Sequence, residues 1–146
     1  IPVVKNVRQY VEVGQQLLDL HINYEYVDPY AGCKTIMHAD KPSYRVQKMR
    51  FKSRTDHSVI KFNSDITIAD IPERAYDYVV NGRSAIEWIM DQYQVKTDKA
   101  SQITDDPNEY SDDPQYIFNL LLRIITVSLR TLDLIAKLPK FEIAEL

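Results

Sequence analysis

The sequence has 146 residues, the usual length of one domain, and its 45% hydrophobic and 27% charged residues argue against a disordered chain. Three glycines are too few for a glycine-rich phosphate-binding loop, and the single cysteine, Cys33, cannot form an internal disulfide. One cysteine fits the reducing cytoplasm, and nothing resembles a signal peptide. Because the first residue is Ile1 rather than Met, we expect residues 1–146 to be one domain of a longer protein.

The net charge is −3, but the two signs of charge are separated along the chain. The acids Asp105, Asp106, Glu109, Asp112 and Asp113 follow one another with no cation between them. By contrast, residues 41–62 contain one acid, Asp56. In the same stretch they contain the cations Lys41, Arg45, Lys48, Arg50, Lys52, Arg54 and Lys61.

The first predicted element is a helix from Asn6 to His21, with Asn6 as its N-cap. Asp28-Pro29 and Gly32 predict a turn region after the helix, because proline pushes the preceding residue out of the helical conformation. The apolar stripe expected along the helix consists of Val7, Tyr10, Val11, Leu17, Leu18 and His21.

A basic β-hairpin is predicted next. Polar and apolar residues alternate strictly over Lys48–Lys52, as in a half-buried strand, and Val59–Phe62 is its expected partner, with Arg54–Ser58 as the connection. A further short strand is expected over Ile66–Ile68. The hairpin would bury Met49, Phe51, Ile60 and Phe62. It would present Lys48, Arg50, Lys52 and Lys61 on the opposite face.

Three helices are expected in the second half. Asp70-Ile71-Pro72 predicts a helix to about Val80 that Asn81-Gly82 ends, and Ser84 with Glu87 forms a capping box for the next one. That helix has an apolar side of Ile86, Ile89, Met90 and Tyr93, with Trp88 alongside. We expect Trp88 and Tyr93 in the core rather than as stacking platforms.

The longest helix follows the polar, turn-rich segment Lys96–Asp112. Asp113-Pro114 starts it, and it runs from about Pro114 to Lys137 before Pro139 ends it. Polar residues interrupt its apolar run, which favours a core helix over a membrane span. Together these elements predict an α+β fold, a mostly helical domain with a basic antiparallel β-hairpin of two or three strands.

No pattern of residues predicts catalysis. His21, His38 and His57 lie in three different elements without metal-ligand spacing, and Cys33 lacks the partners that a nucleophile needs. The paired carboxylates of residues 105–106 and 112–113 suit helix capping better than cation binding, because Asp113-Pro114 already starts a helix. We therefore expect no catalytic residue, no metal site and no cofactor in this chain.

The basic hairpin has two interpretations. A two-stranded ribbon can enter the major groove of DNA or follow a phosphate backbone, where lysine and arginine supply affinity that does not depend on sequence. Alternatively, the cations protect a sheet edge from pairing with other strands. The residue pattern by itself leaves both interpretations open.

Several motifs resemble one known family. The segment YDYVVNGRSAIEWIMDQYQVKTDKAS, residues 76–101, is similar to the C-terminal specificity region of type ISP restriction–modification enzymes, often labelled predicted helicases. The most specific part runs from Asn-Gly-Arg-Ser to Lys-Thr-Asp-Lys. Weaker matches in the same order are Leu20–Glu25, Lys48–Phe51, Asp106–Asn108 and Val127–Leu129, so the resemblance spans nearly the whole chain.

In that family one polypeptide joins a nuclease, an ATP-driven translocase, an adenine methyltransferase and a target-recognition region. The resemblance implies that this chain is the C-terminal part of the target-recognition region, positioning duplex DNA for the parent's catalytic domains. The parent would use S-adenosylmethionine, ATP and Mg²⁺, whereas this chain has neither an Asn-Pro-Pro-Tyr motif nor a phosphate loop. The implied partners are double-stranded DNA and the methyltransferase and translocase domains of the same polypeptide, with no membrane.

Eight cations are candidates for DNA contact. Arg83, at a helix N-terminus, suits either a phosphate or an internal ion pair with an acid of residues 105–113, and Lys96 and Lys99 have the same ambiguity. The alternative function is a helical scaffold that packs the recognition region against the methyltransferase or translocase, without base contacts. The candidate residues are Lys48, Arg50, Lys52, Arg54, Lys61, Arg83, Lys96 and Lys99.

Overall fold

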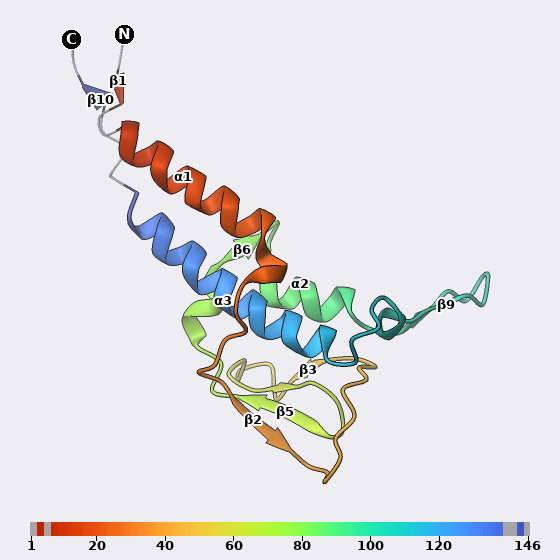
Figure 1. Cartoon of the computed structure of the whole chain (residues 1–146). Helices are drawn as coiled ribbons and strands as arrows, with labels where there is room; N and C mark the ends of the chain where they lie inside the picture. Colours follow the sequence, from red (N-terminus) through yellow and green to blue (C-terminus); the bar gives the residue numbers. More distant parts are fainter. Residues whose placement is uncertain (1–2, 5–6, 139–142, 145–146) are drawn as a thin grey trace.

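The computed structural model, which describes residues 3–4, 7–138 and 143–144, contains two long antiparallel helices, one of which packs at one end over a small sheet (Figure 1). Helix α1 (Val7–Ile22) lies beside α3 (Tyr116–Ala136), and the pair extends away from the sheet. At the far end of this pair, the short strands β1 (Val3–Val4) and β10 (Ile143–Ala144) are hydrogen-bonded antiparallel. The predicted α+β class is confirmed.

Helix α1 forms where it was expected, but the predicted apolar stripe was wrong in part. The side facing α3 carries Val13 and Leu20, with 6% and 9% of their surface exposed, whereas Val11 and Leu18 are 64% and 53% exposed. Apolar residues occur on two sides of this helix, so periodicity alone does not show which side packs. The predicted N-cap, Asn6, lies outside the described residues.

The sheet has four antiparallel strands in the order β2-β5-β4-β3. The predicted hairpin is present as β3 (Arg50–Phe51) and β4 (Ile60–Lys61), and the third strand as β5 (Ile66–Ala69). The fourth strand, β2 (Lys34–Met37), was not predicted, because its four residues show no clear alternation of polar and apolar side chains.

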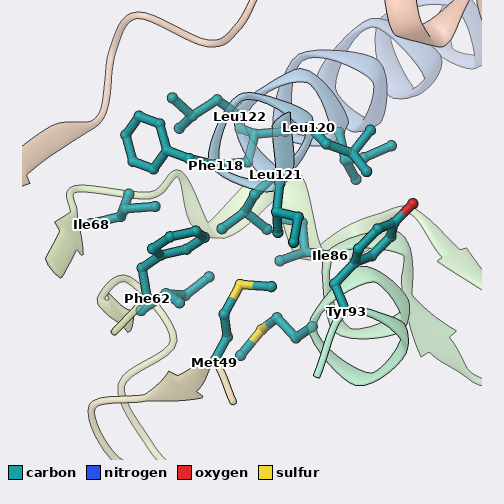
Figure 2. Packing of buried hydrophobic residues seen from close by; sticks show 14 of the residues in the cluster. Met49, Phe62, Ile68, Ile86, Tyr93, Phe118, Leu120, Leu121 and Leu122 are labelled. Carbon is teal, nitrogen blue, oxygen red and sulfur yellow. The ribbon is translucent and has the colours of Figure 1, made fainter. Parts of the chain in front are cut away.

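The core lies between the sheet and α3. Phe62 is fully buried and meets Phe118 of α3 edge to face, with 5.5 Å between ring centroids (Figure 2). Met49 and Ile86 close the same cluster, so the predicted inward face of the hairpin is confirmed, although Phe51 is only half-buried. No helix among the described residues is long and apolar enough to span a membrane.

The predicted helix ending at Val80 was wrong. Residues 73–77 form a 3-10 helix, and β6 (Val79–Val80) then pairs with β7 (Arg83–Ser84) in a tight hairpin. Asn81 and Gly82 have φ values of 50° and 86°, the left-handed conformation of a type I′ turn. The pair Asn-Gly is a signal for a helix end and for a hairpin turn, and here the hairpin forms.

We expect the substitution Gly82→Ala to lower the free energy of unfolding by about 1–2 kcal/mol, because a Cβ atom opposes the left-handed conformation. Gly14→Ala is a matched control. This glycine lies in α1 with nothing within 4 Å of an added Cβ, so alanine should stabilise the chain by about 0.5–1 kcal/mol. Denaturant unfolding measures both changes, and equal effects of the two substitutions would contradict the prediction.

Helix α2 (Ala85–Gln92) begins at the predicted capping box. The Ser84 hydroxyl oxygen accepts the Glu87 N–H at 3.2 Å, and the hydroxyl donates to the Glu87 carboxylate at 2.9 Å. Tyr93 is buried as expected, but Trp88 is 37% exposed, so its predicted core position was wrong. Its indole N–H donates to the carbonyl of Val80 at 2.6 Å, which satisfies the ring at the surface.

The segment between α2 and α3 is more regular than its composition indicates. Strands β8 (Lys96–Thr97) and β9 (Thr104–Asp105) pair antiparallel and stand out from the body (Figure 1). A 3-10 helix follows over Pro107–Glu109. Helix α3 is present, but it begins at Tyr116, after Gln115, so the predicted N-cap Asp113 and first-turn Pro114 were wrong. Asp113 instead accepts the Gln115 N–H at 2.9 Å in the turn before the helix, and Pro139 lies outside the described residues.

Candidate nucleic-acid interface

A groove of about 470 Å³ lies beside the hairpin of β3 and β4, and we call it the basic groove. Two of its four cations, Lys48 and Arg50, come from the alternating segment, in which the apolar residues face the core and the charged ones face outward. Arg50 and Lys61 are direct partners across the two strands. The basic groove is lined by Ser43, Arg45, Gln47, Lys48, Arg50, Lys61, Asn63, Ser64 and Asp65.

Lys48, Arg50 and Lys61 are exposed cations without a direct ion pair. None of them pairs with another residue in the part of the chain that the structure describes, although Asp65 also lines the basic groove. Like charges directly opposite each other destabilise a pair of strands, so the placement of Arg50 against Lys61 costs stability in the free protein. An anion bound between the two side chains would remove that cost.

Arg45 differs from the other cations of the basic groove because it is paired with Asp106. Hydrogen bonds from Asn108 hold the pKa of Asp106 below its usual range, and the Arg45 guanidinium adds to this effect. The carboxylate is therefore ionised at neutral pH and neutralises Arg45. This pair connects the basic groove to residues 105–113, which we call the acidic loop.

Asn108 joins the acidic loop to the segment just before β3. Its side-chain oxygen accepts the Val46 N–H at 2.8 Å, and its amide nitrogen donates to the Val46 carbonyl at 2.7 Å. Asp106 caps the 3-10 helix by accepting the Asn108 N–H at 3.0 Å. Asp106-Pro107-Asn108 was noted only as a family motif, and the capping interpretation of the acidic pairs is confirmed at Asp106.

Asn108→Ala is expected to lower the free energy of unfolding by about 2 kcal/mol, because two hydrogen bonds to partly buried backbone are lost. Thermal or denaturant unfolding measures the change. Glu109→Ala, at an exposed neighbouring position, is the control and should shift stability by less than about 0.5 kcal/mol. If Asn108→Ala lowered the free energy of unfolding no more than Glu109→Ala does, the two hydrogen bonds to Val46 would not stabilise the fold.

Lys52 and Arg54 lie further along the hairpin and outside the basic groove, and both are exposed. The loop that carries them makes several internal contacts. The His57 ring stacks on Phe51 with 4.0 Å between centroids, and the Tyr76 hydroxyl donates to the His57 carbonyl at 2.5 Å. Hydrogen bonds from Ser58 lower the pKa of Asp56, and the nearby Lys52 contributes to the same shift.

Arg83 is held by an aromatic ring and an acid. Its guanidinium carbon lies 4.0 Å from the centroid of Trp88, and its Nη2 is 3.5 Å from the Asp91 carboxylate. The expected acid from residues 105–113 was therefore the wrong partner, since the residue in contact belongs to α2. Lys96 lies 3.9 Å from the same carboxylate. Arg83 and Asp91 share a depression of about 180 Å³ with Lys48, so this cluster adjoins the cations of the hairpin.

Cys33 is half-buried, and two of the histidines are hydrogen-bonded to threonine side chains. Burial, helped by Asp70, raises the pKa of the Cys33 thiol to about 11, so the thiol is neutral at physiological pH. His38 is hydrogen-bonded to Thr67 at 2.9 Å and His21 to Thr131 at 3.0 Å. Within the described residues, no three His, Cys, Asp or Glu side chains are grouped to hold a metal ion.

The chain is similar to a defined family and to solved enzymes. The sequence profile of the type ISP C-terminal specificity domain matches residues 1–120. No curated protein matches the chain. The structure of a nuclease-deletion mutant of the type ISP restriction-modification enzyme LlaGI, in complex with a DNA substrate mimic, is 58% identical, with a TM-score of 0.90. It covers 97% of this chain and 11% of that one.

A second type ISP enzyme gives the same result. The ATP-dependent restriction-modification enzyme LlaBIII, solved bound to DNA, is 56% identical with a TM-score of 0.91, and the match covers 99% of this chain and 9% of LlaBIII. The chain thus spans about a tenth of these enzymes. The DrdV–DNA complex has the same fold, at 24% identity and a TM-score of 0.73, over 94% of this chain and 15% of DrdV.

Proposed function

We propose, from the premise that the chain belongs to the family of type ISP C-terminal specificity domains, that it is a DNA target-recognition subdomain. In the full-length protein it would position duplex DNA for the methyltransferase and the nuclease–translocase in the cytoplasm. The observation that carries the proposal is the basic groove, in which Arg50 and Lys61 face each other and neither has an ion-pair partner among the described residues. A phosphate of the DNA backbone would supply the missing negative charge.

The comparison with solved enzymes also supports this function. Two relatives with more than half of their residues identical over this region are enzymes solved with DNA or a DNA mimic. The full-length protein would then be an ATP-dependent restriction endonuclease and adenine methyltransferase that uses S-adenosylmethionine, ATP and Mg²⁺. In that arrangement this chain supplies the binding of the duplex and no part of the chemistry.

The proposal is tested by selecting duplexes from a pool with 20 randomised base pairs, using the full-length protein. We expect one short sequence to be enriched, because a recognition domain separates specific from non-specific sites by a factor of about 10³ or more. Retention of duplexes without enrichment of any sequence would refute target recognition, even if the protein binds DNA tightly.

A second candidate function is the scaffold, and helix α1 favours it. Val11, Leu18 and Ile22 are 64%, 53% and 64% exposed, and their spacing of seven and four residues aligns them on one side of the helix. This side is opposite Val13 and Leu20, which pack on the rest of the domain. A helix with apolar residues on two opposite sides suits a position between two packed bodies.

Replacing Val11, Leu18 and Ile22 by serine in the full-length protein tests the scaffold. If α1 packs against the methyltransferase or translocase, methylation should fall while the affinity for duplex DNA stays within about threefold of wild type, a difference below roughly 0.7 kcal/mol. Full methylation by this variant would exclude the scaffold role and leave DNA recognition unaffected.

A further inference from the structure

The paired strands β8 and β9, with the loop between them, form a ribbon of residues 96–105 that buries nothing. All ten residues are exposed, and Ile103 has 69% of its surface accessible. Figure 1 shows the ribbon standing out from the body beyond α2 and α3. Because stability comes mainly from buried apolar surface, the fold gains little from these residues. These exposed residues are therefore available to contact another molecule.

The ribbon is nevertheless held in one conformation by its own hydrogen bonds. The Asp98 carboxylate accepts the Ala100 N–H at 3.1 Å and the Ser101 hydroxyl at 2.9 Å. The backbone of Asp98 is bonded to Ile103 at 2.9 Å and to Gln102 at 2.7 Å. A preformed tip loses less conformational entropy when it binds a partner than a flexible loop would.

The base of the ribbon is continuous with the basic groove. The Val95 N–H, immediately before the ribbon, donates to the Gln47 carbonyl at 2.8 Å, and Gln47 is a lining residue of that groove. The acids at the base are already engaged, since Asp105 accepts the Tyr110 hydroxyl at 2.5 Å and Asp106 is paired with Arg45. A duplex bound by the groove would therefore lie next to the ribbon.

We propose that the ribbon enters the major groove of the bound duplex and that its tip reads bases, an inference that rests on the proposed recognition function. Two residue steps from Lys96 to Asp98 span about 7 Å at about 3.3 Å per residue, and the turn of residues 99–101 carries the tip further out. The major groove is about 8.5 Å deep and about 12 Å wide, so it admits two strands about 4.8 Å apart. The ribbon is long enough to reach the base edges and narrow enough to fit.

Three exposed side chains at the tip have the chemistry for this contact. The Gln102 amide matches the donor and acceptor of adenine, Lys99 can donate to the acceptors of guanine, and Ile103 can contact the methyl group of thymine. Ser101 and Asp98 instead hold the tip in shape. The geometry therefore separates two roles, with the basic groove holding phosphates and the ribbon tip discriminating sequence.

The test is selection from the randomised duplex pool by the full-length protein carrying Lys99→Ala, Gln102→Ala and Ile103→Ala together. We expect about tenfold or greater loss of preference at one or more positions of the wild-type sequence. Affinity for a fixed random-sequence duplex should fall only by the contribution of one lysine, with the salt slope changing by about 1. The matched control Gln16→Ala, Lys34→Ala and Val79→Ala replaces exposed residues elsewhere and should enrich the wild-type sequence.

The outcomes separate this inference from the recognition function. A tip variant that enriches the wild-type sequence to the wild-type level would overturn the role of the ribbon and leave recognition standing. A wild-type protein that enriches no sequence would refute recognition and the ribbon with it. Should the triple variant fold poorly by circular dichroism, Gln102→Glu keeps the shape of the side chain and should change the preference at one base pair, and unchanged preference would again refute the role.

Discussion

Replacing Lys48, Arg50 and Lys61 by glutamine is expected to weaken binding of the full-length protein to duplex DNA by about 10²–10³-fold at 0.1 M salt. Each phosphate contact releases about 0.9 counterion, so three lost contacts also reduce the slope of log affinity against log salt by about 3. The effect should be the same for every duplex sequence, because phosphate contacts carry no base information. Removing Arg50 and Lys61 also relieves the repulsion between the two strands, so the folded domain should be no less stable.

Fluorescence anisotropy with one labelled duplex, repeated from 0.05 to 0.3 M salt, measures both quantities. A control variant with Arg8, Lys34 and Arg130 replaced by glutamine has the same change of net charge at exposed positions outside the basic groove. We expect its slope to stay within about 1 of the wild-type slope. If the two triple variants lost affinity equally, the binding would depend on net charge and the groove would have no special role.

Phe62→Ala is expected to lower the free energy of unfolding by about 3–5 kcal/mol. The ring is fully buried between the sheet and α3, so alanine leaves a cavity and removes the edge-to-face contact with Phe118. Because domains of this size have a total stability of about 5–15 kcal/mol, the variant would lose a large part of it. Urea unfolding followed by circular dichroism gives the difference between the two proteins.

Phe62→Leu tests whether lost volume is the cause. Leucine fills most of the space and should cost less than about half as much as alanine. Ile103→Ala removes a large apolar side chain that is already exposed, and its cost should be below about 0.5 kcal/mol. Similar losses for Phe62→Ala and Ile103→Ala would mean that Phe62 is not part of a packed core in solution.

The elements that the sequence predicts well are those whose local signals agree. Alternation along Lys48–Lys52 fixes which side chains of the hairpin are buried, and Ser84 with Glu87 fixes the start of α2. Asn81-Gly82 has two meanings, and only the pairing of Val80 with Arg83 selects the hairpin. Helix α1 has two apolar sides, so its packing side depends on where α3 lies.

In the candidate site, too, some contacts follow from local sequence patterns and others do not. The grouping of Arg50 with Lys61 follows from strand register, which alternation and turn length determine. The ion pair between Arg83 and Asp91 does not follow from strand register, because the two residues are eight positions apart and lie in a strand and a helix. The two hydrogen bonds between Asn108 and Val46 join residues that are 62 positions apart, and no local pattern in the sequence predicts them. Local sequence patterns therefore do not predict the contacts between segments that are far apart in the chain.

The pairing of β1 with β10 has a consequence for how this domain can be joined to other polypeptides. Any polypeptide joined before β1 and any joined after β10 would start from one place, at the end of the helix pair opposite the sheet (Figure 1). A foreign domain with the same pairing could be grafted there without changing the path of the flanking chain. The 16 residues of α1 span about 24 Å. Over that length, a tilt of about 10° at the junction would move the sheet end of the helix pair by roughly 4 Å, slightly more than one base-pair step of about 3.4 Å.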